Sequence, residues 1–493
     1  MELIWNEISI DRIAGGSVSQ ALAEGNVPAP EGRNIASVLD AQGSVDLTSF
    51  EVVPGHVNIE GAVHVEFICT DGDANVYAFT SSAPFKHSLA IEEAKPGMRA
   101  NLTAVVQTLN ATPNSSQIAL EAVADISCRL EDPVPMRVMA GLSGVGDLEM
   151  KTERVEYTRR ADAGGGLIRV REDIAAAGIN AVLTASGEAM IRSIELENGD
   201  ACVSGTLTVS ALCADSGGRL SQVVQHIPFE ELVAIESASM MPSGRVSVQS
   251  ISVRTVGAEF GILSVESIIN VELFTPQRSS VTLTLDAYSP SLPFRPATQR
   301  VRFMLQGPGA SGKQTLRESV EVPEGLPDIY RPLYSSARPM VTSCSCGDGK
   351  LDVEGILFTR IIYQTDGGTL YSFTEDIPFF AQMDAECTAM CDADANVRCT
   401  ASIGGGTGHA ADVNYTLYID AEVYRAYETE AVTGIEECAP PDAPKGIIIC
   451  FAEEGETLYD IAKRFNISRE SLREANPQLK DTITPGQRLV LLV

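Results

Sequence analysis

Apolar and polar residues alternate with a period of two over much of residues 1–427. In residues 203–211, for example, apolar side chains recur at alternate positions, and the turn dipeptide Asn198-Gly199 precedes this run. The apolar residues Val353, Ile356 and Phe358 follow a second turn dipeptide, Asp348-Gly349. Such alternation is typical of strands with one buried face, and these dipeptides favour tight hairpins. The pattern therefore predicts that the body of the chain is mainly β.

The pattern changes from Ile447 onward. A short apolar strand (447–451) precedes a run with helical spacing (458–465), a second helix (469–475) with Ser468 as its N-cap, and a last strand (489–493). This order predicts a small β-α-α-β domain. Its core is expected to contain Leu458, Ile461, Ala462, Phe465 and Leu472.

A frame of two glycines and a Pro-Phe pair occurs three times in the body. In every copy a turn glycine precedes a strand glycine by six residues, and the strand glycine precedes the proline by 23. The three copies are Gly55, Gly61 and Pro84; Gly199, Gly205 and Pro228; and Gly349, Gly355 and Pro378. Repeats of this kind predict tandem domains of one fold. Each strand glycine is expected to mark a bulge or a close backbone approach.

The expected organisation is therefore three tandem β-rich repeat domains followed by the small C-terminal domain. The predicted ranges are 1–130, 131–275 and 276–427 for the repeats, 428–446 for a Pro-rich linker, and 447–493 for the β-α-α-β domain. The stretches between consecutive copies also repeat, as Ser143 and Ser289 illustrate, so we expect them to be parts of the fold.

Composition and charge argue against some classes of function. The formal net charge is −30, and residues 447–493 contribute only −1 from six basic and seven acidic residues, which leaves −29 on the rest. So acidic a chain is not expected to bind nucleic acid or to insert directly into a membrane. Residues 1–16 lack the features of an export signal, and the eleven cysteines show no regular disulfide spacing, so a reducing cytosol is expected.

No catalytic site is predicted. Residues 307–313 resemble a phosphate-binding loop, but Gln314 stands where such a loop needs Ser or Thr, and the following residues are β-like. The five histidines form no triad with a nucleophile. We therefore expect a protein that is not an enzyme and has no cofactor.

Five cysteines fall in the third copy. They are Cys344, Cys346, Cys387, Cys391 and Cys399. Close thiolates could bind zinc, whereas a free cysteine also packs as a small apolar side chain. Because the first two copies lack these thiols, packing is the preferred interpretation and no metal site is predicted.

The body resembles SPOCS domains, β-rich modules that occur in tandem in spore coat proteins. The resemblance rests on the strand glycine, the Ile-Pro-Phe element and the alternating closing strand. The second and third copies match best in these elements, although residues 172–178 of the second are a degraded opening segment. The first copy has Ala83 before its Pro-Phe pair and is the most divergent.

The last 47 residues resemble a LysM domain. The matching elements are Gly455-Glu-Thr-Leu458, Ile461-Ala-Lys-Arg-Phe465, Asn476-Pro477 and Ile483-Thr-Pro-Gly-Gln-Arg-Leu489. The resemblance implies a shallow groove for N-acetylglucosamine chains, lined by Gly455, Glu456, Thr457, Leu458, Asn476, Pro477 and Ile483. Glu456 replaces the usual Asp, and Val493 stands where the family often has Pro.

A basic surface is a second candidate binding site in the same domain. Lys463, Arg464, Arg469 and Arg473 lie on or near the two predicted helices. They could bind an acidic protein partner, or they could form a solvated helix face.

Three β repeats followed by one LysM domain are the arrangement of SipL-like spore coat morphogenetic proteins. The resemblance implies a scaffold in the mother-cell cytoplasm, at the forespore surface and in the spore coat. Its implied partners are the ATPase of the coat's basement layer and other coat proteins. The alternative is a peptidoglycan-binding protein of the cell wall or cortex, whose LysM domain binds N-acetylglucosamine-containing glycan.

Overall fold

The computed structural model describes residues 2–8, 12–71, 75–114, 116–132, 136–235, 241–256, 261–307, 309–439, 446–479 and 483–492. It is a mainly β structure with two short helices near the C-terminus, which confirms the predicted fold class. In the described part of the chain, neither helix has the length and apolar character needed to cross a membrane.

Repeat 1 is a sandwich of two three-stranded antiparallel sheets. The sheet orders are β2-β7-β6 and β3-β4-β5. Their strands are β2 (Arg12–Pro28), β3 (Ser37–Val53), β4 (His56–Thr70), β5 (Val76–Ala90), β6 (Arg99–Asn114) and β7 (Gln117–Asp132). Buried side chains from both sheets form one core, because alternate residues of each strand point inward.

Repeats 2 and 3 have the same architecture. Their sheets are β9-β14-β13 with β10-β11-β12, and β16-β21-β20 with β17-β18-β19. The strands of repeat 2 are β9 (Glu149–Ala175), β10 (Ile179–Glu197), β11 (Asp200–Asp215), β12 (Leu220–Val233), β13 (Ser243–Val256) and β14 (Ile262–Tyr288). Those of repeat 3 are β16 (Ala310–Glu321), β17 (Arg331–Gly347), β18 (Lys350–Gln364), β19 (Leu370–Asp384), β20 (Cys391–Gly405) and β21 (Ala410–Glu437).

The strand glycines make room for the aromatic ring of each Pro-Phe pair. Gly355 is the register partner of Phe379, and a Cβ at Gly355 would lie 2.5 Å from that ring and 2.2 Å from the carbonyl oxygen of Met340. The neighbouring strand β17 has a register shift between Val341 and Ser343, beside this glycine. Gly61 and Gly205 have the same surroundings. The prediction of a bulge or a close backbone approach is therefore confirmed.

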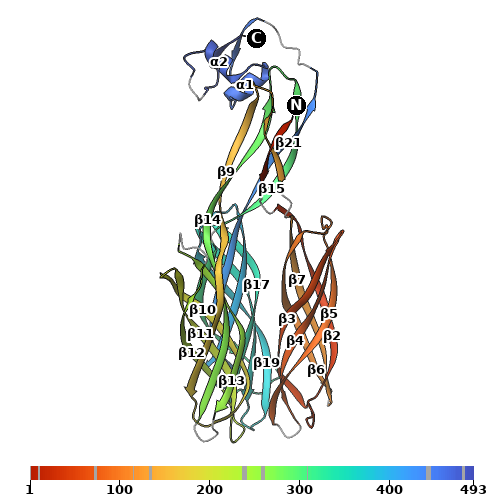
Figure 1. The fold of residues 1–493 in the computed structure, drawn as a ribbon. Coiled ribbons are helices and arrows are strands. Elements are labelled where there is room, and N and C mark those ends of the chain that lie inside the picture. The colour runs from red at the N-terminus through yellow and green to blue at the C-terminus, as the bar shows by residue number, and fades with distance from the viewer. Residues whose placement is uncertain are drawn as a thin grey trace.

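The three repeats lie side by side and share a central apolar cluster (Figure 1). The strand glycines are 144 residues apart between repeats 1 and 2 and 150 apart between repeats 2 and 3. With these offsets, the cluster consists largely of equivalent positions from each repeat. They are Leu39, Leu183 and Leu333; Ile68, Leu212 and Ile362; and Val76, Leu220 and Leu370. The repeats therefore meet around an approximate threefold axis.

The polar contacts between repeats differ from one another, because equivalent positions carry different polar residues. Asp40 accepts a hydrogen bond from Ser336 at 3.0 Å and lies 3.5 Å from the Arg360 guanidinium. Thr184, the equivalent of Asp40 in repeat 2, instead donates to Glu66 at 2.6 Å. Because these pairs are not interchangeable, they favour one order of the repeats around the axis.

A further β unit, which we call the stalk, joins the repeats to the C-terminal domain (Figure 1). It contains β1 (Leu3–Ile8) paired with β8 (Met136–Leu142), and β15 (Phe294–Gln306) paired with the end of β21. The start of β9 and the end of β14 form its third pair. Two apolar clusters stabilise the stalk. The stretches between repeats are thus parts of the fold, as expected.

The structure corrects the predicted linker at 428–446. Strand β21 runs without interruption to Glu437, so residues 428–437 belong to the stalk. Their backbone pairs with β15, and Ala431 and Val432 are fully buried. Residues 440–445, with the prolines of the predicted linker, and Val493 lie outside the described residues.

Candidate functional site

The C-terminal domain forms the predicted β-α-α-β unit. Strands β22 (Ile447–Phe451) and β23 (Arg488–Leu492) pair antiparallel, and helices α1 (Leu458–Arg464) and α2 (Arg469–Ala475) pack on one face of this sheet. Ser468 is the N-cap of α2, as predicted, and accepts a hydrogen bond from the backbone N–H of Ser471 at 3.0 Å.

A capping box begins helix α1. The Thr457 hydroxyl accepts from the backbone N–H of Asp460 at 3.3 Å, and the Asp460 carboxylate accepts from the N–H of Thr457 at 3.0 Å. These bonds satisfy backbone groups that a helix end otherwise leaves unpaired. Although partial burial alone would raise the pKa of Asp460, the bonds from Thr457 and Lys151 hold it below its usual value.

The domain packs against the stalk through two tyrosines. Tyr288, the last residue of β14, belongs to the same buried cluster as Leu458, Ile461 and Leu472. Its ring meets that of Tyr459 edge-on, with centroids 5.3 Å apart, and its hydroxyl donates to the carbonyl of Ile467 at 2.9 Å. The core of the C-terminal domain therefore includes a side chain of the stalk.

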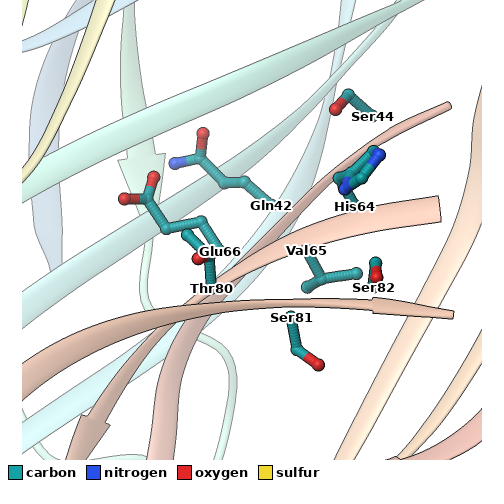
Figure 2. A pocket seen from close by; sticks show the side chains of 9 residues that line it. Gln42, Ser44, His64, Val65, Glu66, Thr80, Ser81 and Ser82 are labelled. Carbon is teal, nitrogen blue, oxygen red and sulfur yellow. The ribbon is translucent and has the colours of Figure 1, made fainter. Parts of the chain in front are cut away.

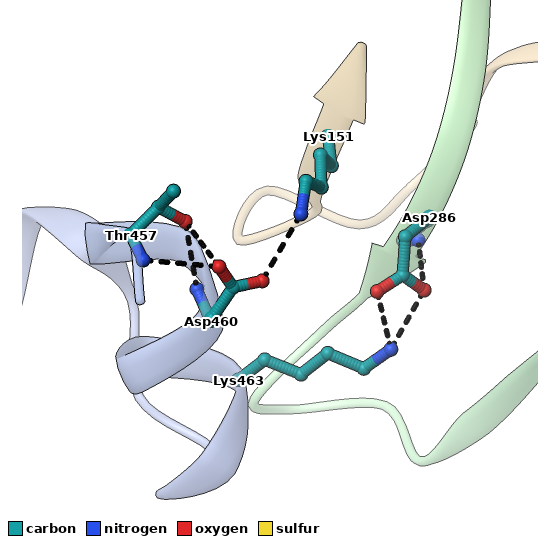
Figure 3. A network of polar contacts seen from close by, with 6 residues as sticks. Lys151, Asp286, Thr457, Asp460 and Lys463 are labelled. Carbon is teal, nitrogen blue, oxygen red and sulfur yellow. Dashed lines mark hydrogen bonds and ion pairs between the residues drawn. The ribbon is translucent and has the colours of Figure 1, made fainter. Parts of the chain in front are cut away.

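Charged residues also join the domain to the stalk, and Figure 3 shows the pairs of Lys463 with Asp286 and of Lys151 with Asp460. Lys463 Nζ lies 2.5 Å from Asp286 Oδ2, and Lys151 Nζ lies 3.2 Å from Asp460 Oδ1. The Glu149 carboxylate accepts from both the backbone N–H and the Nε of Arg469, at 2.9 and 2.5 Å. Three ion pairs thus hold the domain on the stalk. In two of them the basic residue belongs to the C-terminal domain, and in the pair of Lys151 with Asp460 it belongs to the stalk.

Two residues of the predicted basic surface therefore bind the chain's own stalk. Lys463 and Arg469 contact Asp286 and Glu149, while Arg464 lies 2.7 Å from Glu456 within the domain. Arg473 is exposed on α2. No local sequence signal could identify the stalk residues, because they lie 177 and 320 positions from their partners.

The predicted groove residues divide into two groups. Gly455, Thr457 and Pro477 are exposed on the two loops that flank the expected groove, and Ile483 is half-buried against the domain core. Gly455 has φ of +82°, a conformation that favours glycine. These four residues are therefore at least partly exposed to solvent.

Leu458, Asn476 and Glu456 have structural contacts instead. Leu458 is buried in the core. Asn476 is 5% exposed, and its side chain donates to the carbonyls of Leu472 and Val490 and accepts from the N–H of Val490. It thus joins α2 to β23. Glu456 accepts from the N–H of Glu453 at 2.8 Å and pairs with Arg464.

A cavity of about 790 Å³ lies on the face of the β3-β4-β5 sheet that is turned away from the core of repeat 1 and toward the other repeats (Figure 2). Adjacent positions of β3, β4 and β5 line it, including Gln42, His64 and Glu66. Burial, with Asp40 nearby, raises the pKa of Glu66 despite its hydrogen bond from Thr184. This bond crosses from repeat 1 to repeat 2, so Glu66 serves a contact between repeats.

Cys344, Cys346, Cys387 and Cys391 lie close together near the turn between β17 and β18, whereas Cys399 lies further along β20. Cys387 is buried and donates to the carbonyl of Lys350 at 3.0 Å, while Cys344 and Cys346 pack against the repeat core. Burial, together with the nearby thiol of Cys387, raises the pKa of Cys346 to about 12. Within the described ranges, no three His, Cys, Asp or Glu side chains are grouped as metal ligands.

The chain matches two protein-family models. The model described as SipL, SPOCS domain, matches residues 34–114 and 328–402, and the LysM domain model matches residues 453–491. The two segments that match the SPOCS-domain model lie in repeats 1 and 3. The sequence elements had suggested that repeats 2 and 3 match best. Repeat 2 has the degraded opening segment but keeps the same sheet order. No curated protein matches the chain.

Proposed function

Because this is a SipL-like protein, with SPOCS domains followed by a LysM domain, we propose that it is a non-enzymatic scaffold in bacterial endospore coat assembly. In this proposal it docks a coat morphogenetic ATPase at the forespore surface, through its LysM and β domains. It acts in the mother-cell cytoplasm and becomes part of the spore coat. The two family matches support a role in sporulation; the ATPase and the location are proposed from the resemblance.

The attachment of the LysM domain to the stalk is the observation that carries this proposal. A shared apolar contact at Tyr288 and Tyr459 and three ion pairs fix the orientation of the domain. A fixed orientation lowers the conformational cost of binding a large partner. Such an arrangement suits a scaffold, in which binding surfaces must keep a constant relation to one another.

The attachment also limits the LysM surface that we propose for a partner. The salt-bridged face around Lys463 and Arg469 is engaged with Asp286 and Glu149. Among the described residues, Gly455, Thr457 and Pro477 on the exposed loops form no hydrogen bond or ion pair with the stalk. We therefore assign protein docking to the groove loops, with the basic residues holding the domain in place.

A pull-down with the purified coat ATPase tests this proposal. The full chain should retain the ATPase, and a chain ending at Lys445 should lose it. Pro477→Lys should weaken retention, because it places a charge on the exposed groove loop, whereas Glu470→Gln on α2 is the matched control. Equal retention by the full and shortened chains would contradict LysM-mediated docking.

Peptidoglycan binding is the alternative function, and the match to the LysM domain model favours it. Gly455 and Pro477 are exposed in the described structure, as contact with a glycan chain requires. Sedimentation with purified peptidoglycan separates the two functions. Glycan binding without ATPase binding would replace the scaffold proposal with the alternative.

A further inference from the structure

The LysM sheet has an exposed apolar face opposite its helices. On β22, Ile447, Ile449 and Phe451 are 75%, 57% and 60% exposed, and Leu492 on β23 is 58% exposed. Ile447 pairs with Leu492 in the sheet register. We call these four residues the apolar strip.

The residues between the strip positions point the other way. Cys450, Leu489 and Leu491 are buried against α1 and α2, and Ile448 packs on the same core. Both faces of the two-stranded sheet are therefore apolar. A strand with one solvated face normally alternates apolar and polar residues, whereas uninterrupted apolar strands are typical of sheets covered on both sides. A contiguous exposed apolar face of this kind marks an interaction surface.

We propose that the apolar strip binds the same strip of a second copy of this chain, so that two molecules join through their LysM domains. In this arrangement the two sheets pack face to face around a twofold axis. A twofold contact uses one patch on both partners, so an apolar strip is complementary to itself. The only charged residue in the two strands is Arg488, which pairs with Phe451 at one end of the sheet.

The distribution of charge favours a second copy at this place. Residues 1–446 carry a net charge of −29, so two bodies repel each other, while residues 447–493 carry only −1. The LysM domain also lies at the end of the molecule away from the three repeats (Figure 1). Two chains can therefore meet at their LysM domains while their acidic repeats remain apart.

The attachment to the stalk leaves the strip accessible. The stalk contacts the domain through Tyr459, Asp460, Lys463 and Arg469, which lie on α1 or at the start of α2. The strip lies on the opposite face of the sheet. Self-association of this kind therefore requires no separation of the LysM domain from the stalk, and it leaves the groove loops unused.

Sedimentation velocity with the full chain, over a wide range of concentration, tests the proposal. The wild-type chain should reach twice the mass of one chain as concentration rises. Ile449→Lys should remain a monomer at every concentration, because two lysines would oppose each other across the axis. Leu232→Lys, which alters an equally exposed residue of β12 in repeat 2, is the matched control and should still dimerise.

A second variant, with a measurement of folding, distinguishes loss of the dimer from loss of the fold. Leu492→Lys changes the neighbouring strand and should also abolish the dimer, while circular dichroism and the melting temperature report whether each variant keeps its fold. A wild-type chain that stays monomeric, or dimers that persist in both strip variants, would overturn the proposal. Loss of ATPase retention in Ile449→Lys, with a monomeric wild type, would assign the strip to the protein partner instead. The docking proposal is judged separately, by the pull-down.

Discussion

Lys463 on helix α1 forms an ion pair with Asp286 on strand β14, with Nζ 2.5 Å from Oδ2. The two residues are 177 positions apart, and one belongs to the LysM domain and the other to the stalk. Both side chains are partly buried, with 39% and 25% exposed. Lys463 was expected to belong to a surface that binds a partner, and it instead contributes to the contact between the LysM domain and the stalk.

Reversing one charge of this pair should loosen the LysM domain. Asp286→Lys places two ammonium groups together, and we expect a loss of about 1 kcal/mol in docking, because a partly exposed ion pair contributes little more. The rate at which trypsin releases residues 447–493 should rise.

The doubly reversed chain, Asp286→Lys with Lys463→Asp, should restore part of the wild-type protection. Arg300→Glu, which removes an exposed pair in the stalk, serves as the control. Equal cleavage rates in all four chains would show that the ion pair does not contribute to docking.

The Asp460 carboxylate should make the LysM domain sensitive to acid. Its folded-state pKa is lowered, so its contribution to stability is present above the unfolded value of about 3.9 and is lost as pH falls through the folded value. Asp460→Ala removes the capping box and the Lys151 pair and should cost about 1 kcal/mol at pH 7. Thermal unfolding of the two chains should converge below about pH 4. A constant difference at all pH values would contradict the assignment.

The strand glycines should not tolerate a methyl group. Gly355→Ala would place Cβ within 2.5 Å of the Phe379 ring and closer still to a backbone carbonyl, so strand or ring must shift. We expect a loss of about 2 kcal/mol, as in other overpacked cores. Gly347→Ala, in the same hairpin, meets no atom within 4 Å and should change stability little. Urea unfolding measures both; similar midpoints would argue against the steric role.

Arg398 should be required where repeats 2 and 3 meet. Its guanidinium lies 2.9 Å from Glu188 and 2.8 Å from Asp420, and only 19% of its side chain is exposed. Arg398→Met leaves both carboxylates without this partner, and we expect a loss of about 2 kcal/mol at neutral pH.

The stability that Arg398→Met loses should be larger at higher pH. Burial already raises the pKa of Glu188 in spite of Arg398, and removing the arginine raises it further. For an acid with a raised folded pKa, stability falls as pH rises above its unfolded value, since the unfolded state then favours the charged form. The melting temperatures of the variant and wild type should therefore differ more at pH 7.5 than at pH 5. A larger difference at pH 5 would contradict the role of Glu188.

Much of the fold could be predicted because it depends on short-range patterns. Alternation of apolar residues identified the strands, the glycine and Pro-Phe frame identified three copies, and helical spacing identified α1 and α2 with Ser468 as cap. The linker was predicted wrongly at residues 428–437, because polar residues such as Glu428 and Glu430 obscured a strand in which the adjacent residues Ala431 and Val432 are buried. Among the groove residues, Asn476 proved to be a buried structural side chain.

By itself, the sequence determined the β-α-α-β domain, the three repeats and the bulge at each strand glycine, since these follow from residues close together in the chain. Only the tertiary structure decided that the stretches between repeats form a stalk, that Lys463 and Arg469 bind it, and that the apolar strip stays exposed. The physical reason is distance along the chain. Whether a charged or apolar side chain is exposed or contacts another part of the chain depends on residues up to 320 positions away. No local pattern predicts that those residues come close in the fold.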